Sequence, residues 1–407
     1  MKPLFLQGDT VFFKKISFAK ITINDILVIR KNKNYFSHRV IYKNPTYLIT
    51  KGDHTFFHDG KIYPREILGI VYEGKRKNEL FDPNDTYFLQ SVMYLKEVTK
   101  LNDLFTKKNI DFLFLKGIPL YLHIEKKIPK RIYADCDILI KKSHLQRLEE
   151  LLQQNGYEKN NNELSTGNKL LKDKETEISY YKIVHNIPIV LDIHAEVVFM
   201  MNQIGKLEML YPQNYIDAIT KGFLQRKIVI KINNEKFPVL SSTDLVYYLA
   251  LHIFHHNFKG YNRYNFFHNV FKTTKVNYKD LSLLIIKTNV ENFIYPVFMF
   301  YKKYYNPNLS DNFLQKVTPK NGQTYTQNYM NSVDIFEDES QLKAGINRFI
   351  YLLYFSPHPW IKKLLVFLNP SIIISIFVVV WKLLQNKMAF TDTFLFSNIL
   401  RYKPSTS

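Results

Sequence analysis

Short apolar runs alternate with polar turns over the first 75 residues. Five runs rich in β-branched and aromatic residues lie at residues 10–13, 26–29, 39–42, 47–50 and 67–72. Runs of this length, bounded by turns, predict the strands of a small β-barrel or folded sheet. The charged, turn-rich stretch that follows, residues 76–85, is expected to be a linker.

From residue 85 the apolar positions recur every three to four residues. Phe88, Val92, Leu95 and Val98 belong to this series, which predicts a helix over residues 85–106 with Asp85 as its cap. Beyond it, short apolar runs alternate with helical patterns. The predicted strands lie at residues 111–115, 136–140 and 187–193, and the predicted helices at residues 145–155 and 242–258.

These patterns predict an α+β protein with three parts. A small β domain occupies residues 1–75, and a central α/β core with a mixed sheet occupies residues 86–272. Residues 273–407 are expected to form a helical region rich in aromatic side chains, with a loop at residues 306–332. A length of 407 residues is consistent with two or three domains.

The chain is basic, with 56 Lys+Arg against 36 Asp+Glu and a formal net charge of +20. Such a charge favours polyphosphate, acidic membranes or nucleic acid as partners. The lysines are scattered rather than gathered in a stripe and no RNA-binding signature is present, which argues against nucleic acid. Cys136 is the single cysteine, so no internal disulfide can form and a cytoplasmic location is expected.

Membrane targeting is weakly signalled. The first eight residues are too short for a secretory signal core. Residues 364–381 form an uncharged run of eighteen, but Asn369-Pro370 interrupts it. We expect a buried or membrane-surface helix there rather than a span, and peripheral membrane contact stays open.

Two aspartates one residue apart carry the strongest chemical signal. Asp135 precedes, and Asp137 lies within, the strand-like run 136–140. Side chains at i and i+2 of a strand share a face, so both carboxylates point one way and Cys136 points the other. Paired carboxylates repel unless a cation lies between them, which predicts a Mg²⁺ site.

Two flanking segments add to this signal. Lys116-Gly117 forms a turn between a strand and a helix, where free N–H groups can bind an anion. Asp192 lies in a strongly apolar strand and is a candidate third ligand or general base, with His194 and Glu196 on its face placed to orient it. The alternatives are a surface strand end for Asp135 and Asp137, a structural Asp192–His194 pair, and a solvated Lys116.

Together these segments resemble the uncharacterised nucleotidyltransferase family of the polymerase-β-like superfamily. The matching elements are Leu115-Lys116-Gly117, Arg131 with Asp135-x-Asp137, and Asp192-x-His194, and the resemblance spans residues 85–272. Ile118 stands where the superfamily has Ser, so one hydroxyl contact to phosphate is absent.

The resemblance implies Mg²⁺-dependent transfer of a nucleotidyl group from a nucleoside triphosphate, with two metal ions. Asp135, Asp137 and Asp192 would be the catalytic and metal-binding residues. Lys116, Gly117, Arg131 and His194 would bind the nucleotide, although Arg131 also lies in a basic run that solvent alone explains. The base, the acceptor and the oligomeric state are not specified by the sequence.

Residues 1–75 resemble signal peptidase I of the histidine-using type. The matching elements are Met1-x-Pro3, Gly8-Asp9, Asn24-Asp25-Ile26, His38-Arg39-Val40 and Thr50-Lys51-Gly52-Asp53. In that family a catalytic Ser precedes this Met, and we expect His38 and Asp53 to be a protease-like remnant without a nucleophile. The domain would then bind a peptide or protein acceptor by strand addition.

Two rival interpretations stay open. In the first, the protein is not a transferase but a non-catalytic module that binds peptides through both domains. In the second, it is a serine protease whose true start lies upstream. Separately, His252 and His256 lie at i and i+4 of a predicted helix, a spacing that suits zinc, but no nearby carboxylate or cysteine completes a ligand set. Structural or substrate-facing histidines are expected there.

Overall fold

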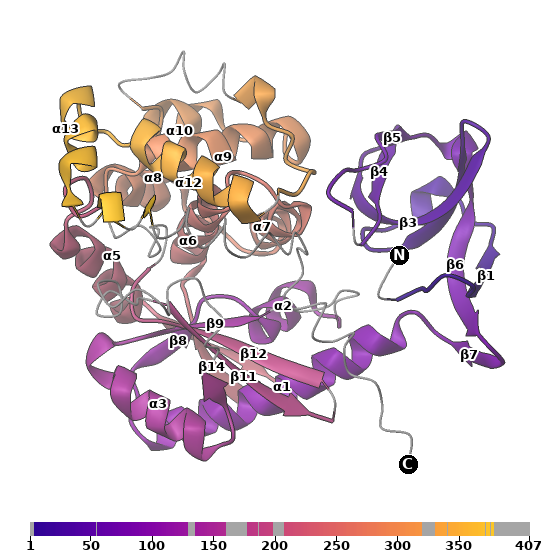
Figure 1. Cartoon of the computed structure of the whole chain (residues 1–407), viewed down its shortest axis with the longest axis horizontal. Coiled ribbons are helices and arrows are strands. Elements are labelled where there is room, and N and C mark those ends of the chain that lie inside the picture. Colours follow the sequence, from indigo (N-terminus) through magenta and orange to yellow (C-terminus); the bar gives the residue numbers. More distant parts are fainter. Residues whose placement is uncertain are drawn as a thin grey trace.

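The chain folds as an α+β protein in which a small β domain stands beside a larger body (Figure 1). The larger body has a second sheet at its lower side, with helices above and below it. The computed structural model describes residues 4–53, 55–128, 135–159, 177–185, 187–197, 207–319, 330–339, 341–370, 372–374 and 376–377.

The first sheet is antiparallel, with strand order β1-β6-β2-β3-β4-β5. Its strands are β1 (Thr10–Lys14), β2 (Ile26–Lys31), β3 (Asn34–Lys43), β4 (Leu48–Lys51), β5 (Lys61–Ile62) and β6 (Ile67–Arg76). Each of the five predicted strands is confirmed. The sheet bends around a small core in which Leu27, Ile29, Val40, Leu48 and Ile62 are buried.

The stretch expected to be a linker contains a strand. β7 (Glu79–Phe81) pairs with the end of β6 through a hairpin, because Lys77 takes the positive φ that a tight turn needs. The first helix, α1 (Asp85–Lys107), then begins as predicted, with Asn84 rather than Asp85 in the capping position.

The second sheet is mixed, with strand order β10-β11-β12-β9-β8-β14-β13. Its strands are β8 (Phe112–Phe114), β9 (Cys136–Ile140), β10 (Glu158–Lys159), β11 (Glu177–Val184), β12 (Ile187–His194), β13 (Ile228–Ile232) and β14 (Glu235–Val239). β9 is buried at every position and lies at the centre, parallel to β12 and antiparallel to β8. α1 and α3 (Leu145–Gln154) lie below this sheet in Figure 1.

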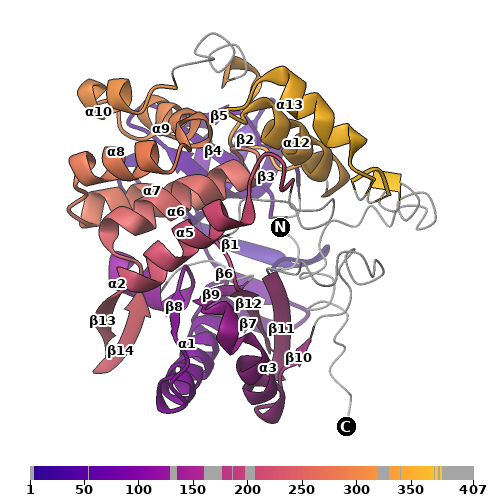
Figure 2. The same ribbon diagram turned by 90° about the vertical axis from the view of Figure 1, so that its left-hand side faces the viewer.

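The helical layer lies on the other side of the second sheet (Figure 2). It comprises α5 (Gln213–Gln225), α6 (Ser242–His255), α7 (Tyr261–Thr273), α8 (Tyr278–Lys287), α9 (Glu291–Tyr304), α10 (Asp311–Lys316), α12 (Gln341–Tyr354) and α13 (Trp360–Leu365). α10 lies within the stretch expected to be a loop, because Ser310 caps it and Phe313 and Leu314 are buried. One continuous apolar core extends from the second sheet through these helices.

The β domain is held against the larger body at a junction formed by residues 51–58 and 334–339. His58 bonds Asp334 at 2.8 Å, Lys51 pairs with Asp338, and the Asp338 N–H donates to the Phe56 carbonyl at 3.0 Å. Nearby, a cavity of about 680 Å³ is lined by the β domain, α2 (Ile118–Glu125), α7 and the end of α9.

Within the described residues, no helix combines the length and the apolar character needed to cross a bilayer. The run at 364–381 lies partly outside the described residues, which stop at residue 377 and also omit 371 and 375.

Candidate active site

Three carboxylates converge on the central strands of the second sheet. β12 runs parallel to β9 in a register that pairs Asp192 with Asp137, and Asp135 directly precedes β9. One oxygen from each of the three carboxylates lies within 4.8 Å of the others. The strand pattern therefore predicted correctly that Asp192 would lie beside the Asp135–Asp137 pair, while the roles of these residues remain predictions.

The turn that leads into α2 lies against the same strand. Gly117 has φ +121° and ψ −171°, a backbone conformation that residues other than glycine rarely adopt. A Cβ at this position would lie 2.6 Å from Cys136 Sγ. Cys136 is fully buried and faces this turn, away from the carboxylates, so glycine is what allows the turn to approach β9 so closely.

Lys116 places a positive charge between two of the carboxylates. Its Nζ lies 3.2 Å from Asp135 Oδ1 and 2.9 Å from Asp137 Oδ2. Burial favours the neutral amine, but the two carboxylates raise the pKa of Lys116 well above its ordinary value. The site thus already holds one cation where the sequence predicted a metal ion.

Asp137 and Asp192 respond differently to the same surroundings. Burial raises the pKa of Asp137, but Lys116 and His194 outweigh that effect and lower it. Among the described residues no cation lies so close to Asp192, and burial together with Asp135, Glu177 and Asp137 raises the pKa of its carboxyl well above the ordinary value. Asp192 Oδ1 accepts a hydrogen bond from the Ser179 hydroxyl on β11.

His194 binds a different aspartate from the one expected. Its Nε2 lies 3.0 Å from Asp137 Oδ1, so the expectation that it orients Asp192 is wrong. Asp137 and Asp192 are neighbours on parallel strands, and His194, two residues after Asp192, reaches across to β9. Burial lowers the pKa of His194, but Glu177 and Asp137 raise it to about 9, so the ring is positively charged at neutral pH. The Glu196 carboxylate also has a different partner: its Oε1 accepts a hydrogen bond from Gln213 Nε2 at 2.8 Å.

A group of mutually repelling basic side chains in the helical layer was not recognised in the sequence. It comprises His252 of α6, His256 directly after that helix, Arg263 of α7 and Arg348 of α12. The spacing of the two histidines was visible in the sequence, but nothing in the local sequence of either arginine marked it. Among the described residues, neither histidine belongs to a three-ligand group suited to a metal.

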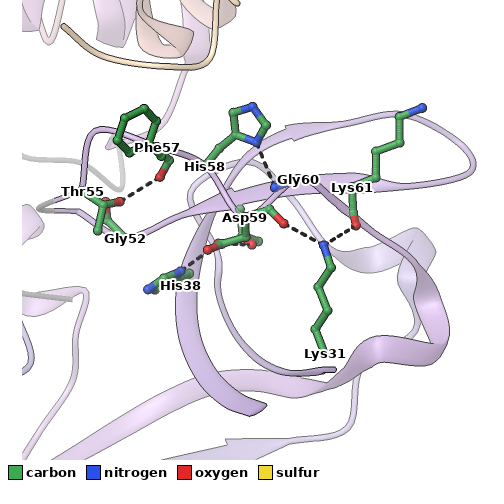
Figure 3. A network of polar contacts seen from close by, with 10 residues as sticks. Lys31, His38, Gly52, Thr55, Phe57, His58, Asp59, Gly60 and Lys61 are labelled. Carbon is green, nitrogen blue, oxygen red and sulfur yellow. Dashed lines mark hydrogen bonds and ion pairs between the residues drawn. The ribbon is translucent and has the colours of Figure 1, made fainter. Parts of the chain in front are cut away.

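In the β domain His38 has a different acidic partner from the one expected. Its Nδ1 lies 2.7 Å from Asp59 Oδ2 (Figure 3). The same oxygen also accepts a hydrogen bond from the Thr50 hydroxyl at 2.7 Å. Asp53 instead receives a two-pronged bond from Arg39, with both distances 2.7 Å. The predicted His38–Asp53 pair is therefore replaced by two separate pairs, His38–Asp59 and Arg39–Asp53. Arg131, the remaining predicted site residue, lies outside the described residues.

The fold and the site define an α+β protein with a carboxylate cluster suited to a divalent cation beside a glycine turn. A model of the family described as uncharacterised nucleotidyltransferase matches residues 77–306, more than half of the chain, and the protein belongs to this family. The match begins within the β6–β7 hairpin and continues just past α9, further in both directions than the sequence resemblance at 85–272. No curated protein matches the chain.

Proposed function

We propose that this protein is a Mg²⁺-dependent nucleotidyltransferase that transfers a nucleotidyl group from a nucleoside triphosphate to a hydroxyl or phosphate acceptor. The observation that carries the proposal is the convergence of Asp135, Asp137 and Asp192, with oxygens within 4.8 Å of one another. Carboxylate oxygens are the ligands that Mg²⁺ prefers, and this chemistry commonly uses carboxylate-held metal ions. The family match supports the general reaction.

The residues present fit a divalent cation. The Lys116 ammonium lies about as far from Asp135 as from Asp137, which shows that the gap between these carboxylates can accommodate a positive charge. Bound Mg²⁺ would neutralise phosphate oxygens and align the triphosphate. Asp135, Asp137 and Asp192 would hold it, and Lys116 would be released to pair with a phosphate group.

Asp192 is the proposed proton acceptor. Burial and three neighbouring carboxylates favour its protonated form, so it holds a proton readily in the state described. Positive charge at the cluster would lower its pKa and leave it ionised, ready to accept the proton of an acceptor hydroxyl. His194, charged and bonded to Asp137, would fix the orientation of that ligand.

The nucleotide would approach the N-terminus of α2. Gly117 leaves no side chain over the free N–H groups of Ile118 and Leu120 in the first turn, which are suited to bind phosphate oxygens. Arg131, four residues before Asp135, would add a further positive charge to the nucleotide site.

The acceptor is proposed to be a peptide or protein presented by the β domain. The signal-peptidase-like motifs of residues 1–75 support this role, as does the cavity of about 680 Å³ shared between that domain, α2 and α7. α2 connects the Gly117 turn to this cavity, so an acceptor bound there would lie one short helix away from the carboxylates.

Contact with a membrane surface is proposed for the C-terminal helices. Trp360, Ile361, Leu364 and Leu368 are each more than 60% exposed beside Lys362, a combination suited to an anionic bilayer. Co-sedimentation with anionic lipid vesicles that is lost in Ile361→Glu would support this contact.

The transferase proposal is tested with a labelled nucleoside triphosphate and the purified full chain. We expect label transfer with Mg²⁺, none with a chelator, and none in Asp135→Asn, whose partly exposed carboxylate can be changed with little disturbance of the fold. Equal labelling by Asp135→Asn and the unmodified chain would overturn the assignment of the site.

A further inference from the structure

The cavity between the β domain and the larger body has a row of amide side chains along one wall. Asn262, Asn265 and Asn269 of α7 all line it, and all three are half-buried. Because they are three and four residues apart, they lie on one face of the helix. α7 faces the β domain here (Figure 1), so the row borders the space between the two parts.

Two of these amides are fixed by one hydrogen bond each. A shift in the β3–β4 register leaves Ile41 out of the pairing, and its carbonyl accepts from Asn265 Nδ2 at 3.2 Å. Asn269 Nδ2 donates to Glu125 Oε1 of α2 at 3.0 Å. No other hydrogen bond of either side chain is found among the described residues. Each amide therefore keeps its oxygen and its second N–H for an occupant.

The charged side chains that line the cavity do not select an anion. Lys43 Nζ already donates to the carbonyls of Ala19 and Ile21, at 3.1 Å and 2.7 Å. Lys127 and Lys272 are exposed to solvent. Much of the remaining wall is aromatic and comes from Tyr42, Tyr121, Phe266 and Tyr304. Such a wall suits a neutral occupant that has both apolar surface and paired hydrogen-bonding groups.

The spacing of the two fixed amides matches an extended peptide. Asn265 and Asn269 are four residues apart, which separates them by about 6 Å along the helix axis. In an extended chain, alternate residues point the same way and lie about 6.7 Å apart. Each peptide residue has one N–H donor and one carbonyl acceptor, which complement the oxygen and the N–H that each amide leaves open.

We infer that Asn265 and Asn269 bind the main chain of an extended acceptor peptide, through the N–H and C=O groups of two alternate residues. The inference rests on the proposed function and deepens it, because it identifies what the cavity recognises in the acceptor. A helix or a paired strand uses these same main-chain groups internally. The acceptor is therefore a peptide, or a protein with an unfolded segment, rather than a folded surface.

The test compares two probes by fluorescence anisotropy with the full chain. One is a labelled hexapeptide of alternating Thr and Val, whose β-branched residues favour an extended chain, and the other is the same peptide with every residue N-methylated. N-methylation removes the N–H donors and should weaken binding about tenfold or more. Asn265→Ala and Asn269→Ala should each weaken binding of the unmethylated peptide about fivefold, and should weaken binding of the methylated peptide less.

Asn312→Ala is the matched control, because it removes an amide from an exposed position on α10, and it should bind both probes like the unmodified chain. Circular dichroism checks that each variant is folded. Equal affinity of the unmodified chain for the two peptides, or no binding of either, would overturn the inference. The same would follow if each asparagine variant lost as much affinity for the methylated peptide as for the unmethylated one.

A third probe, the neutral sugar maltotriose, tests a hydroxyl-rich occupant and should not bind. Binding of maltotriose but not of the peptide, lost in both asparagine variants, would overturn recognition of the main chain. If the peptide binds through both asparagines but no nucleotide is transferred to any peptide, the inference stands and the proposed function fails. If both variants label a peptide acceptor with an unchanged KM, the function stands and the inference fails.

Discussion

Each sheet of this protein carries a histidine bonded to an aspartate, and the two pairs differ in what surrounds them. In the second sheet His194 bonds Asp137, and both side chains are only 5% exposed. In the first sheet His38 bonds Asp59, with exposures of 21% and 19%. The first of these pairs has Asp135, Asp192 and Lys116 beside it, whereas the second has Thr50 and a lysine that bonds only carbonyls.

The difference shows that a His–Asp pair by itself does not indicate a metal site. Asp59 has one neutral and one imidazole donor, so its charge is satisfied locally. Asp137 shares a small buried volume with two other carboxyl groups, and one ammonium and one imidazolium can balance only two of the three, so the third, Asp192, favours its protonated form. A third carboxyl group without a cation of its own is what distinguishes the candidate active site.

Matched removal of one carboxylate from each region should give the largest difference. Asp135→Asn should lower the rate of nucleotidyl transfer by about 10³-fold or more, because it removes a ligand of the proposed Mg²⁺, which stabilises negative charge in the transition state. Asp59→Asn should leave transfer within about twofold, because its hydrogen bonds serve the β domain. Initial rates of label transfer measure both, and a comparable loss in the two variants would remove the distinction between the pairs.

Glycine substitutions test how tightly each region is built. Gly117→Ala combines a forbidden backbone angle with a 2.6 Å approach to Cys136, and should lower the free energy of unfolding by about 3–5 kcal/mol. Gly8→Ala also has a positive φ, of +94°, but meets nothing within 4 Å, so about 1–2 kcal/mol is expected. Urea unfolding followed by far-ultraviolet circular dichroism measures both free energies. An equal cost at the two positions would contradict the close approach at Gly117.

A third His–Asp pair joins the two regions and should have the smallest effect. The hydrogen bond to Asp334 is the chief cause that raises the pKa of His58. A raised pKa stabilises the folded chain fully below the unfolded value near 6.5, and this contribution is lost as pH rises through the folded pKa. Because Asp334 is 41% exposed, the contribution should stay below about 1 kcal/mol.

His58→Gln should therefore reduce stability more at pH 5.5 than at pH 9. Paired urea titrations at the two values measure this difference, and His185→Gln, on the β11–β12 turn, is the control. A larger loss at pH 9 would mean that the bond to Asp334 does not determine the protonation of His58.

Local patterns predicted most of the fold. The strands of the first sheet, α1 and the strands that carry Asp137 and Asp192 all follow from apolar spacing, and the carboxylate cluster followed from putting two such strands side by side. The partners of His38 and His194 could not be predicted in this way. Which carboxylate a histidine contacts depends on the register between strands and on the path of the loops. Arg263 and Arg348 were invisible for the same reason: they are 85 residues apart, and only helix packing places them together.

The junction also limits how the two parts can be separated. Ile41, Tyr42 and Ile49 belong to the first sheet by sequence, yet they are buried in the main apolar core with the helical layer. Cutting the chain near residue 76 would remove three members of that core and also free Asp334 and Asp338 from their partners. In evolutionary terms, a recombination event at the hairpin would damage both parts at once.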